Sequence, residues 1–265
     1  MKKGILILFI MIFSLSSYSQ LNGWFFVNTE ADLLTGLISV YDFNQVPDQY
    51  ELEDQYGSND FPFSGAPTVY PTQAQSGILS YSYSFGSTTI LKRTTIDANL
   101  MAFHTISVWV KRTNNSSDGQ IVSNYYGGYV SQNHYNIMLK SNGSSNAIVC
   151  EYRDDSGVNL SLSYYPGSDI WQNNWVHIVY VIGNNYQYIY INGTKEATGI
   201  NGDGDVNVRT VADPDRIGYR EDENGVPTNH FIGNIDQLIY WSIELTQTQI
   251  TRLVKGGYGL AYVNW

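Results

Sequence analysis

The chain has 265 residues and a net charge of −10 at pH 7, with 14% charged and 14% aromatic residues. This surplus of negative charge opposes binding to phosphate backbones and anionic lipid, so nucleic acid is excluded as an expected partner. The length suits one β-rich domain with an ample core. The only cysteine, Cys150, excludes an intramolecular disulfide, and its place in an apolar alternating run predicts a buried, inert thiol.

The N-terminus has the pattern of an export signal. Two lysines precede the apolar stretch 5–13, and Ser17 and Ser19 supply the small residues that suit a signal peptidase. That stretch is too short to cross a hydrocarbon core of roughly 30 Å as a helix. The sequence therefore predicts a signal peptide at 1–19, a secreted or cell-surface protein, and no membrane insertion after cleavage.

The rest of the chain divides into a lead-in at 20–35, a domain at 36–258 and an aromatic tail at 259–265. Short alternating or apolar runs rich in Tyr, Ile, Val and Thr are separated by Gly, Asn, Ser and Asp, which is typical of strands and turns. The strands expected in chain order are 37–43, 79–85, 103–111, 120–123, 135–140, 147–152, 159–163, 175–182, 187–191, 216–219 and 231–241.

A hairpin is expected at Asn192-Gly193. This pair is preferred in type I′ turns because both central residues need positive φ. In the strand before the turn, Tyr186, Tyr188 and Tyr190 share one face and isoleucines share the other. One face must line the core, and the other must be covered by a second layer or form an aromatic surface.

A single helix is expected near the C-terminus. Thr246 and Gln249 form a Thr-x-x-Gln capping box, an apolar stripe follows, and Gly256 ends it.

Several of these runs resemble the sequence motifs of a known family and follow one another in the same order. The run Phe-His-Thr-Ile-Ser-Val-Trp-Val-Lys at 103–111 looks like a Phe-Thr-Ile-Ser-x-Trp-Val-Lys strand with one residue inserted, and 36–43, 54–60, 175–193 and 231–250 match further pieces. Together they resemble the laminin-G-like and pentraxin-like branch of the concanavalin A-like lectin/glucanase superfamily. The resemblance implies an all-β jelly-roll sandwich of two antiparallel sheets, with one short C-terminal helix outside and variable recognition loops.

Because this superfamily includes glucanases, catalysis needs a test. Retaining glycosidases place two carboxylates about 5 Å apart, and the sandwich glucanases carry theirs as Glu-x-Asp-x-x-Glu on one strand. The sequence lacks that spacing, and the acidic runs 51–54 and 221–223 read as solvated turns. It also lacks a Gly-x-Ser-x-Gly elbow and a His-x-x-x-His pair, and His177 is expected to be structural. We therefore expect no catalysis, with a divergent glycosidase or lyase as the third alternative.

Structural calcium is an open expectation. Calcium takes six to eight oxygen ligands, so loops rich in Asp and Asn are candidates, although each reads equally as a solvated turn. The resemblance places the family's ion at Asp42, Asn44, Asn59 and Asp60, with Asp236 from the closing strand.

The 22 tyrosines and six tryptophans exceed what strands alone require. Rings between strands stack on sugar faces and also suit protein recognition. The candidate ligand-binding rings are Tyr125, Tyr126, Tyr129, Tyr164, Tyr165 and Trp171. The sequence thus favours an exported binding or adhesion module for a glycan or glycoprotein, and the alternative is a structural or protein-interaction component of a surface assembly.

Overall fold

The structure is a computed structural model, and only part of the chain is described below. The described residues are 31–45, 51–62, 71–74, 77–78, 80–93, 104–114, 118–124, 135–142, 145–153, 159–183, 185–200 and 215–255. The expected signal peptide, most of the lead-in and the aromatic tail lie outside these residues.

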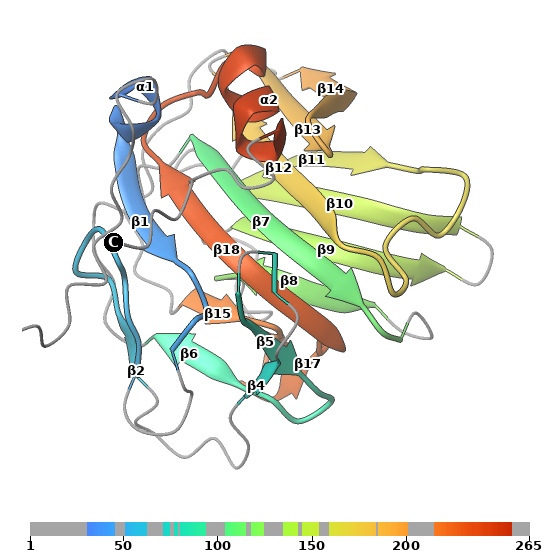
Figure 1. The fold of residues 1–265 in the computed structure, drawn as a ribbon. Coiled ribbons are helices and arrows are strands. Elements are labelled where there is room, and N and C mark those ends of the chain that lie inside the picture. The colour runs from blue at the N-terminus through green and yellow to red at the C-terminus, as the bar shows by residue number, and fades with distance from the viewer. Residues whose placement is uncertain are drawn as a thin grey trace, which may run out of the picture.

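One sheet has eight antiparallel strands in the order β14-β13-β12-β7-β18-β5-β4, with β1 paired to the C-terminal half of β18 (Figure 1). Its strands are β1 (Leu37–Tyr41), β4 (Thr72–Ala74), β5 (Ser82–Phe85), β7 (Thr105–Arg112), β12 (Val176–Ile182), β13 (Tyr186–Ile191), β14 (Thr194–Ile200) and β18 (Gly233–Trp241).

The second sheet has six strands in the order β11-β10-β9-β8-β15-β6. These are β6 (Leu91–Arg93), β8 (Gly119–Ser123), β9 (Tyr135–Asn142), β10 (Ser145–Arg153), β11 (Asn159–Tyr164) and β15 (Asp215–Ile217). Two short hairpins flank the sheets: β2 (Glu51–Leu52) with β3 (Phe61–Pro62), and β16 (Arg220–Glu221) with β17 (Pro227–Thr228).

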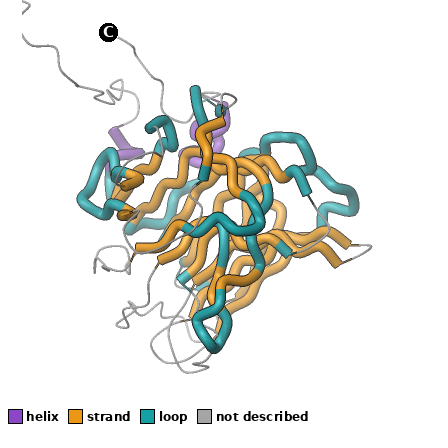
Figure 2. Tube along the Cα trace, turned by 90° about the horizontal axis from the view of Figure 1, so that it is seen from below, coloured by secondary structure: helices purple, strands orange, loops and turns teal. Residues whose placement is uncertain are grey.

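The two sheets bury their inner faces against each other, which makes the expected sandwich. On β12, Val176, Ile178 and Tyr180 point into the core between the sheets, whereas Val179 and Val181 point outward. The outward residues are also buried, because they pack in a second cluster with α2 (Gln247–Lys255). Figure 2 shows the helices on one side of the strands, so this outer face is covered over part of its area.

The C-terminal helix is confirmed, but a second helix was not expected. The one-turn helix α1 (Ala31–Leu34) lies in the lead-in. Asp32 makes an ion pair with Arg252 of α2, and the Trp241 indole Nε1 donates to the Leu33 carbonyl at 2.8 Å. These contacts hold α1 in place. Its four residues are too few to show the periodic pattern of apolar residues that predicts a helix.

The Asn192-Gly193 hairpin is confirmed, with φ values of 49° and 81°. The tyrosine face of β13 is covered by a second layer at one end and forms an aromatic surface at the other, which are the two possibilities that the sequence left open. Ile189 lines the core between the sheets, Tyr190 is buried in the second cluster under α2, and Tyr186 at the far end remains 45% exposed.

Two strands end earlier than the sequence predicts. β1 ends at Tyr41 because Phe43 has a φ of 54°, which a strand does not accommodate. β15 ends at Ile217 because Gly218 has a φ of 83°. In both cases the backbone turns while the apolar run continues.

Candidate functional site

The most exposed of the described candidate rings lies at the end of β11. Tyr164 is the last residue of that strand, and the side chain of Tyr165 is 63% exposed. The Tyr164 hydroxyl lies close to the carboxylate of Glu196 on β14, and partial desolvation together with that carboxylate raises the pKa of Tyr164. The end of β11 therefore carries one open ring, Tyr165, and the Glu196 carboxylate of β14 lies close to the preceding ring.

Glu196 was missed by the sequence reasoning. A lone exposed glutamate on a strand carries no signal of its own. The Asn192-Gly193 turn places β14 beside β13, but only the stacking of the sheets brings β14 to β11.

Trp171 is a correction to the sequence-based expectation. Its side chain is fully buried in the core between the sheets, and its carbonyl accepts a hydrogen bond from the Arg112 N–H at 3.1 Å. A buried indole cannot stack on a ligand at the surface. The loop residues Tyr125, Tyr126 and Tyr129 lie outside the described residues.

Three of the expected metal ligands lie close together. Asp42 accepts hydrogen bonds from the N–H and the Nδ2 of Asn44, both at 3.1 Å. Asp236 is 1% exposed and accepts the Ile78 N–H at 2.7 Å. Burial and the nearby Asp42 carboxylate raise the pKa of Asp236 well above its usual range. Asn44 belongs to the group through its bonds to Asp42, and its Oδ1 also accepts the Tyr81 N–H at 3.0 Å.

Asn59 and Asp60 belong to a different arrangement, which organises the loop between β2 and β3. Asp54 accepts from the N–H groups of Val40 and Tyr56 through Oδ1 and from the Asn59 N–H through Oδ2. Asp60 in turn accepts the Asp54 N–H at 2.7 Å. These side chains hold the loop against β1, and the hydrogen bonds to Asp54 already explain their positions.

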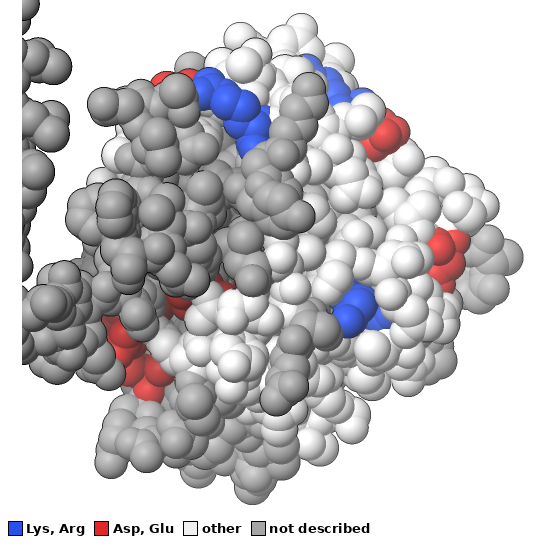
Figure 3. Space-filling model, viewed as in Figure 1, with Lys and Arg blue, Asp and Glu red and all other residues white. Residues whose placement is uncertain are grey.

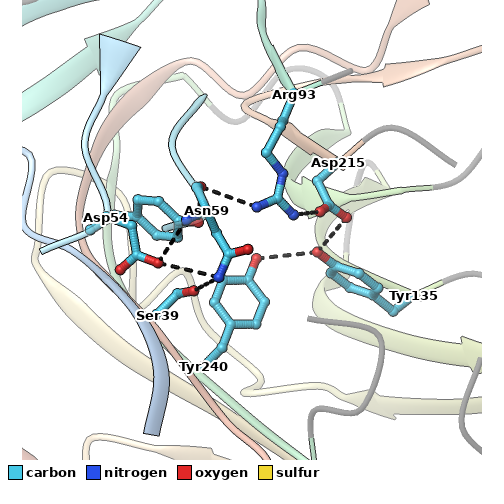
Figure 4. A network of polar contacts seen from close by, with 8 residues as sticks. Ser39, Asp54, Asn59, Arg93, Tyr135, Asp215 and Tyr240 are labelled. Atoms are coloured by element: carbon cyan, nitrogen blue, oxygen red, sulfur yellow. Dashed lines mark hydrogen bonds and ion pairs between the residues drawn. The ribbon is translucent and has the colours of Figure 1, made fainter. Parts of the chain in front are cut away.

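A buried polar network continues from this loop into the core (Figure 4). Arg93 donates to the Asn59 carbonyl at 3.1 Å and makes an ion pair with Asp215. The Tyr135 hydroxyl donates to Asp215 at 3.0 Å and lies 3.2 Å from the Tyr240 hydroxyl. The network thus ties the loop to both sheets and leaves Asn59 in a structural role.

Several acidic side chains lie close together around β2. Glu51 of β2 lies near Asp60 and Glu53, and burial together with these like charges raises the pKa of Glu51. Figure 3 shows red groups at the lower left, over the region of β2, with no blue groups among them in this view. Among the residues that the structure describes, no three His, Cys, Asp or Glu side chains are placed to hold a metal ion together. A cation in this region would therefore need amide or backbone oxygens as well.

The acidic run at Glu221 differs from the solvated turn that the sequence predicts. Glu221 is buried and accepts hydrogen bonds from Lys92 and Arg216. Although burial alone would raise it, these two cations hold the pKa of Glu221 below its usual value. The other two residues of the run lie in a turn as predicted, since the Asp222 Oδ1 accepts the Asn224 N–H at 2.9 Å and Glu223 is exposed.

Cys150 is buried as expected. Burial raises the pKa of its thiol well above the usual value, so the reactive thiolate is disfavoured. In the part of the chain that is described, no helix has the length and apolar character needed to span a bilayer.

A family model described as the concanavalin A-like lectin/glucanases superfamily matches residues 88–251. No curated protein sequence matches the chain.

Solved structures share the fold at low sequence identity. Domain 4 of AbnA, an extracellular arabinanase from Geobacillus stearothermophilus solved with arabinotriose, is 18% identical with a TM-score of 0.56, over 82% of this chain and 98% of that one. The CBM40 of the Ruminococcus gnavus IT-sialidase, bound to α2,3-sialyllactose, is 15% identical with a TM-score of 0.53, over 70% and 97% of the two chains. The receptor-binding domain of botulinum neurotoxin D is 14% identical with a TM-score of 0.55, over 83% and 52%.

Proposed function

We propose that this chain, which belongs to the concanavalin A-like lectin/glucanases superfamily, is an exported, non-catalytic module that binds carbohydrate or glycoprotein. The observation that carries the proposal is the open Tyr165 ring, which follows Tyr164, whose hydroxyl lies close to the Glu196 carboxylate. Aromatic rings stack on the apolar faces of sugars, and carboxylates accept hydrogen bonds from sugar hydroxyls. This edge of the sandwich therefore offers both kinds of contact.

The similar structures support the proposal, since two of them hold a sugar ligand. The arabinanase domain was solved with arabinotriose and the CBM40 with sialyllactose. Each is a part of a larger enzyme rather than a complete enzyme in its own right. Their fold is thus compatible with a binding role of the kind proposed for this chain.

A glycan array tests the proposal. The mature secreted protein should bind at least one glycan class, and Tyr165→Ala should weaken that binding at least tenfold. Tyr56→Ala is the matched control, because Tyr56 is 52% exposed in a different loop. Silence across broad glycan classes would contradict a lectin role.

The same preparation separates the alternatives. Stoichiometric capture of a protein partner that sugars do not displace would favour the surface-assembly role. Release of reducing ends from a polysaccharide would establish a glycosidase instead. Export is checked by mass spectrometry of the secreted protein, whose N-terminus is expected at Gln20.

We also propose that Asp42, Asn44 and Asp236 hold a structural calcium ion. The residues fit this ion because a buried carboxylate beside a second carboxylate is costly unless a cation compensates the charge. Calcium would link β1, β18 and the segment around Ile78. Asn59 and Asp60 are left out, since they belong to the separate arrangement around Asp54 that organises the loop between β2 and β3.

Calorimetric titration with calcium tests this assignment. The wild-type chain should bind calcium and melt at a higher temperature in its presence. Asp236→Asn should lose both effects, whereas Asp60→Asn should retain calcium binding. Equal loss in both variants, or no binding by the wild type, would overturn the assignment.

A further inference from the structure

The outer face of β13 carries a row of tyrosines that runs from buried to open. Tyr186 and Tyr188 are stacked with ring centroids 6.2 Å apart and planes 21° from parallel. Tyr188 also meets Tyr190 edge-on at 6.3 Å, and Tyr190 is buried in the cluster under α2. Tyr188 is half-buried against the same cluster and Tyr186 is 45% exposed, so the nearly parallel Tyr186 and Tyr188 rings form a platform that opens to solvent at its Tyr186 end.

Lys195 of β14 lies over this platform. Its Nζ is 4.0 Å from the Tyr188 ring centroid and 5.6 Å from that of Tyr190, so the ammonium contacts aromatic faces rather than water alone. Lys195 makes no ion pair with another residue that the structure describes. By contrast, Lys92 pairs with Glu221 and Arg252 with Asp32. The platform thus carries a positive charge that lacks a described counter-ion.

The open end of the platform is bounded by β14. Ile200 is the Cα partner of Tyr186 and is 76% exposed, and Thr198 pairs with Tyr188 and is also exposed. Apolar carbon, a hydroxyl and an ammonium therefore surround two parallel rings. In Figure 1 β13 and β14 lie at the upper right, far from β2 at the lower left.

We propose that Tyr186, Tyr188 and Lys195 bind an acidic sugar residue of a glycan. The apolar face of the sugar ring stacks on the open Tyr186 ring, and its carboxylate pairs with the Lys195 ammonium that lies over the neighbouring Tyr188 ring. This inference rests on the proposed carbohydrate-binding function and names the ligand class of a second surface on the same edge strand. Glu196 contacts Tyr164 of the opposite sheet, so the two surfaces lie on either side of β14.

Charge decides among the possible ligands of this surface. A cationic ligand would have to displace Lys195 from the rings that it already contacts. A polyanion such as nucleic acid would meet the repulsion of a chain whose net charge is −10. A single carboxylate on a sugar ring fits one lysine and two rings without requiring a wider basic surface.

Calorimetric titration of the full mature chain with an oligosaccharide that carries a single galacturonate residue tests the proposal. The matched ligand is its methyl ester, which keeps the sugar rings and loses the negative charge. We expect the acid form to bind at least tenfold more tightly than the ester, and to weaken as salt rises because exposed charges are screened over about 10 Å at 0.1 M.

Variants assign the contacts. Lys195→Met should remove the preference for the acid form, and Lys195→Arg should restore it. Tyr186→Ala should weaken binding of both forms at least tenfold. Lys140→Met is the control, because Lys140 lies on β9 of the other sheet. Circular dichroism and melting temperature confirm that each variant folds.

The outcomes separate this inference from the proposed function. Equal binding of acid and ester, or an unchanged preference in Lys195→Met, overturns the acidic-sugar site. If neutral glycans still bind through Tyr165 in that case, the proposed function stands without it. Absence of binding to every glycan tested overturns both.

Discussion

At the scale of single residues, burial sets the chemistry of His177. Its ring packs against Trp109 in a tilted arrangement with centroids 4.9 Å apart, and its Nε2 lies 2.7 Å from the Ser107 hydroxyl. Burial lowers the pKa of His177 from 6.5 to about 3. The imidazole is therefore neutral at physiological pH and suits the structural role that the sequence predicts.

This shift predicts how stability depends on pH. The folded pKa is depressed, so the contribution of His177 is fully present above pH 6.5 and is lost as pH falls toward 3, because only the unfolded chain takes up the proton. One proton corresponds to about 1.4 kcal/mol per pH unit. Urea unfolding between pH 7 and pH 4 should show this slope, and His177→Gln should remove it. Equal slopes in the two proteins would contradict the prediction.

At the scale of elements, local sequence chemistry is a reliable guide where the partners are neighbours. The capping box at the start of α2 forms as expected, since the Gln249 N–H donates to the Thr246 hydroxyl at 3.3 Å and the Thr246 N–H to the Gln249 Oε1 at 2.8 Å. The Asn192-Gly193 hairpin likewise needs only its own turn residues. By contrast, the burial of Glu221 as a carboxylate depends on its bond with Lys92, which lies on a strand far away in the sequence.

The capping box gives a prediction for α2. Thr246→Ala removes a side-chain acceptor from the first turn and should lower the free energy of unfolding by about 1 kcal/mol. Thr248→Ala is the control, because Thr248 is exposed within the same helix. Chemical denaturation measures both variants, and an equal effect would show that the cap contributes nothing specific.

At the scale of the whole molecule, the network around Arg93 and Asp215 joins the two sheets. Its members come from β6 and β15 of one sheet, and it reaches Tyr135 of that sheet and Tyr240 of the other. The sequence offers no signal for this ion pair, since Arg93 and Asp215 are separated by most of the domain. Sheet topology alone makes them neighbours, because β6 and β15 pair.

Breaking the pair should be costly, and replacing both members should not. Arg93→Met leaves Asp215 buried beside Tyr135 without its cation, so we expect a loss of about 3–5 kcal/mol in the free energy of unfolding. The double variant Arg93→Met/Asp215→Leu should lose less than Arg93→Met alone, because no uncompensated charge remains. Urea denaturation checks this, and additive losses would rule out coupling between the two residues.

The sequence by itself determined the all-β class, most strands, the Asn192-Gly193 hairpin and the capped C-terminal helix. These depend on periodicity and turn chemistry, which act between residues close together in the chain. Tertiary structure alone decided which candidate side chains reach solvent and which meet. It buried Trp171, engaged Asn59 and Asp60 with Asp54, and brought Glu196 to Tyr164. Such contacts follow from the packing of two sheets, because alternation gives the face of a strand and not the segment that covers it.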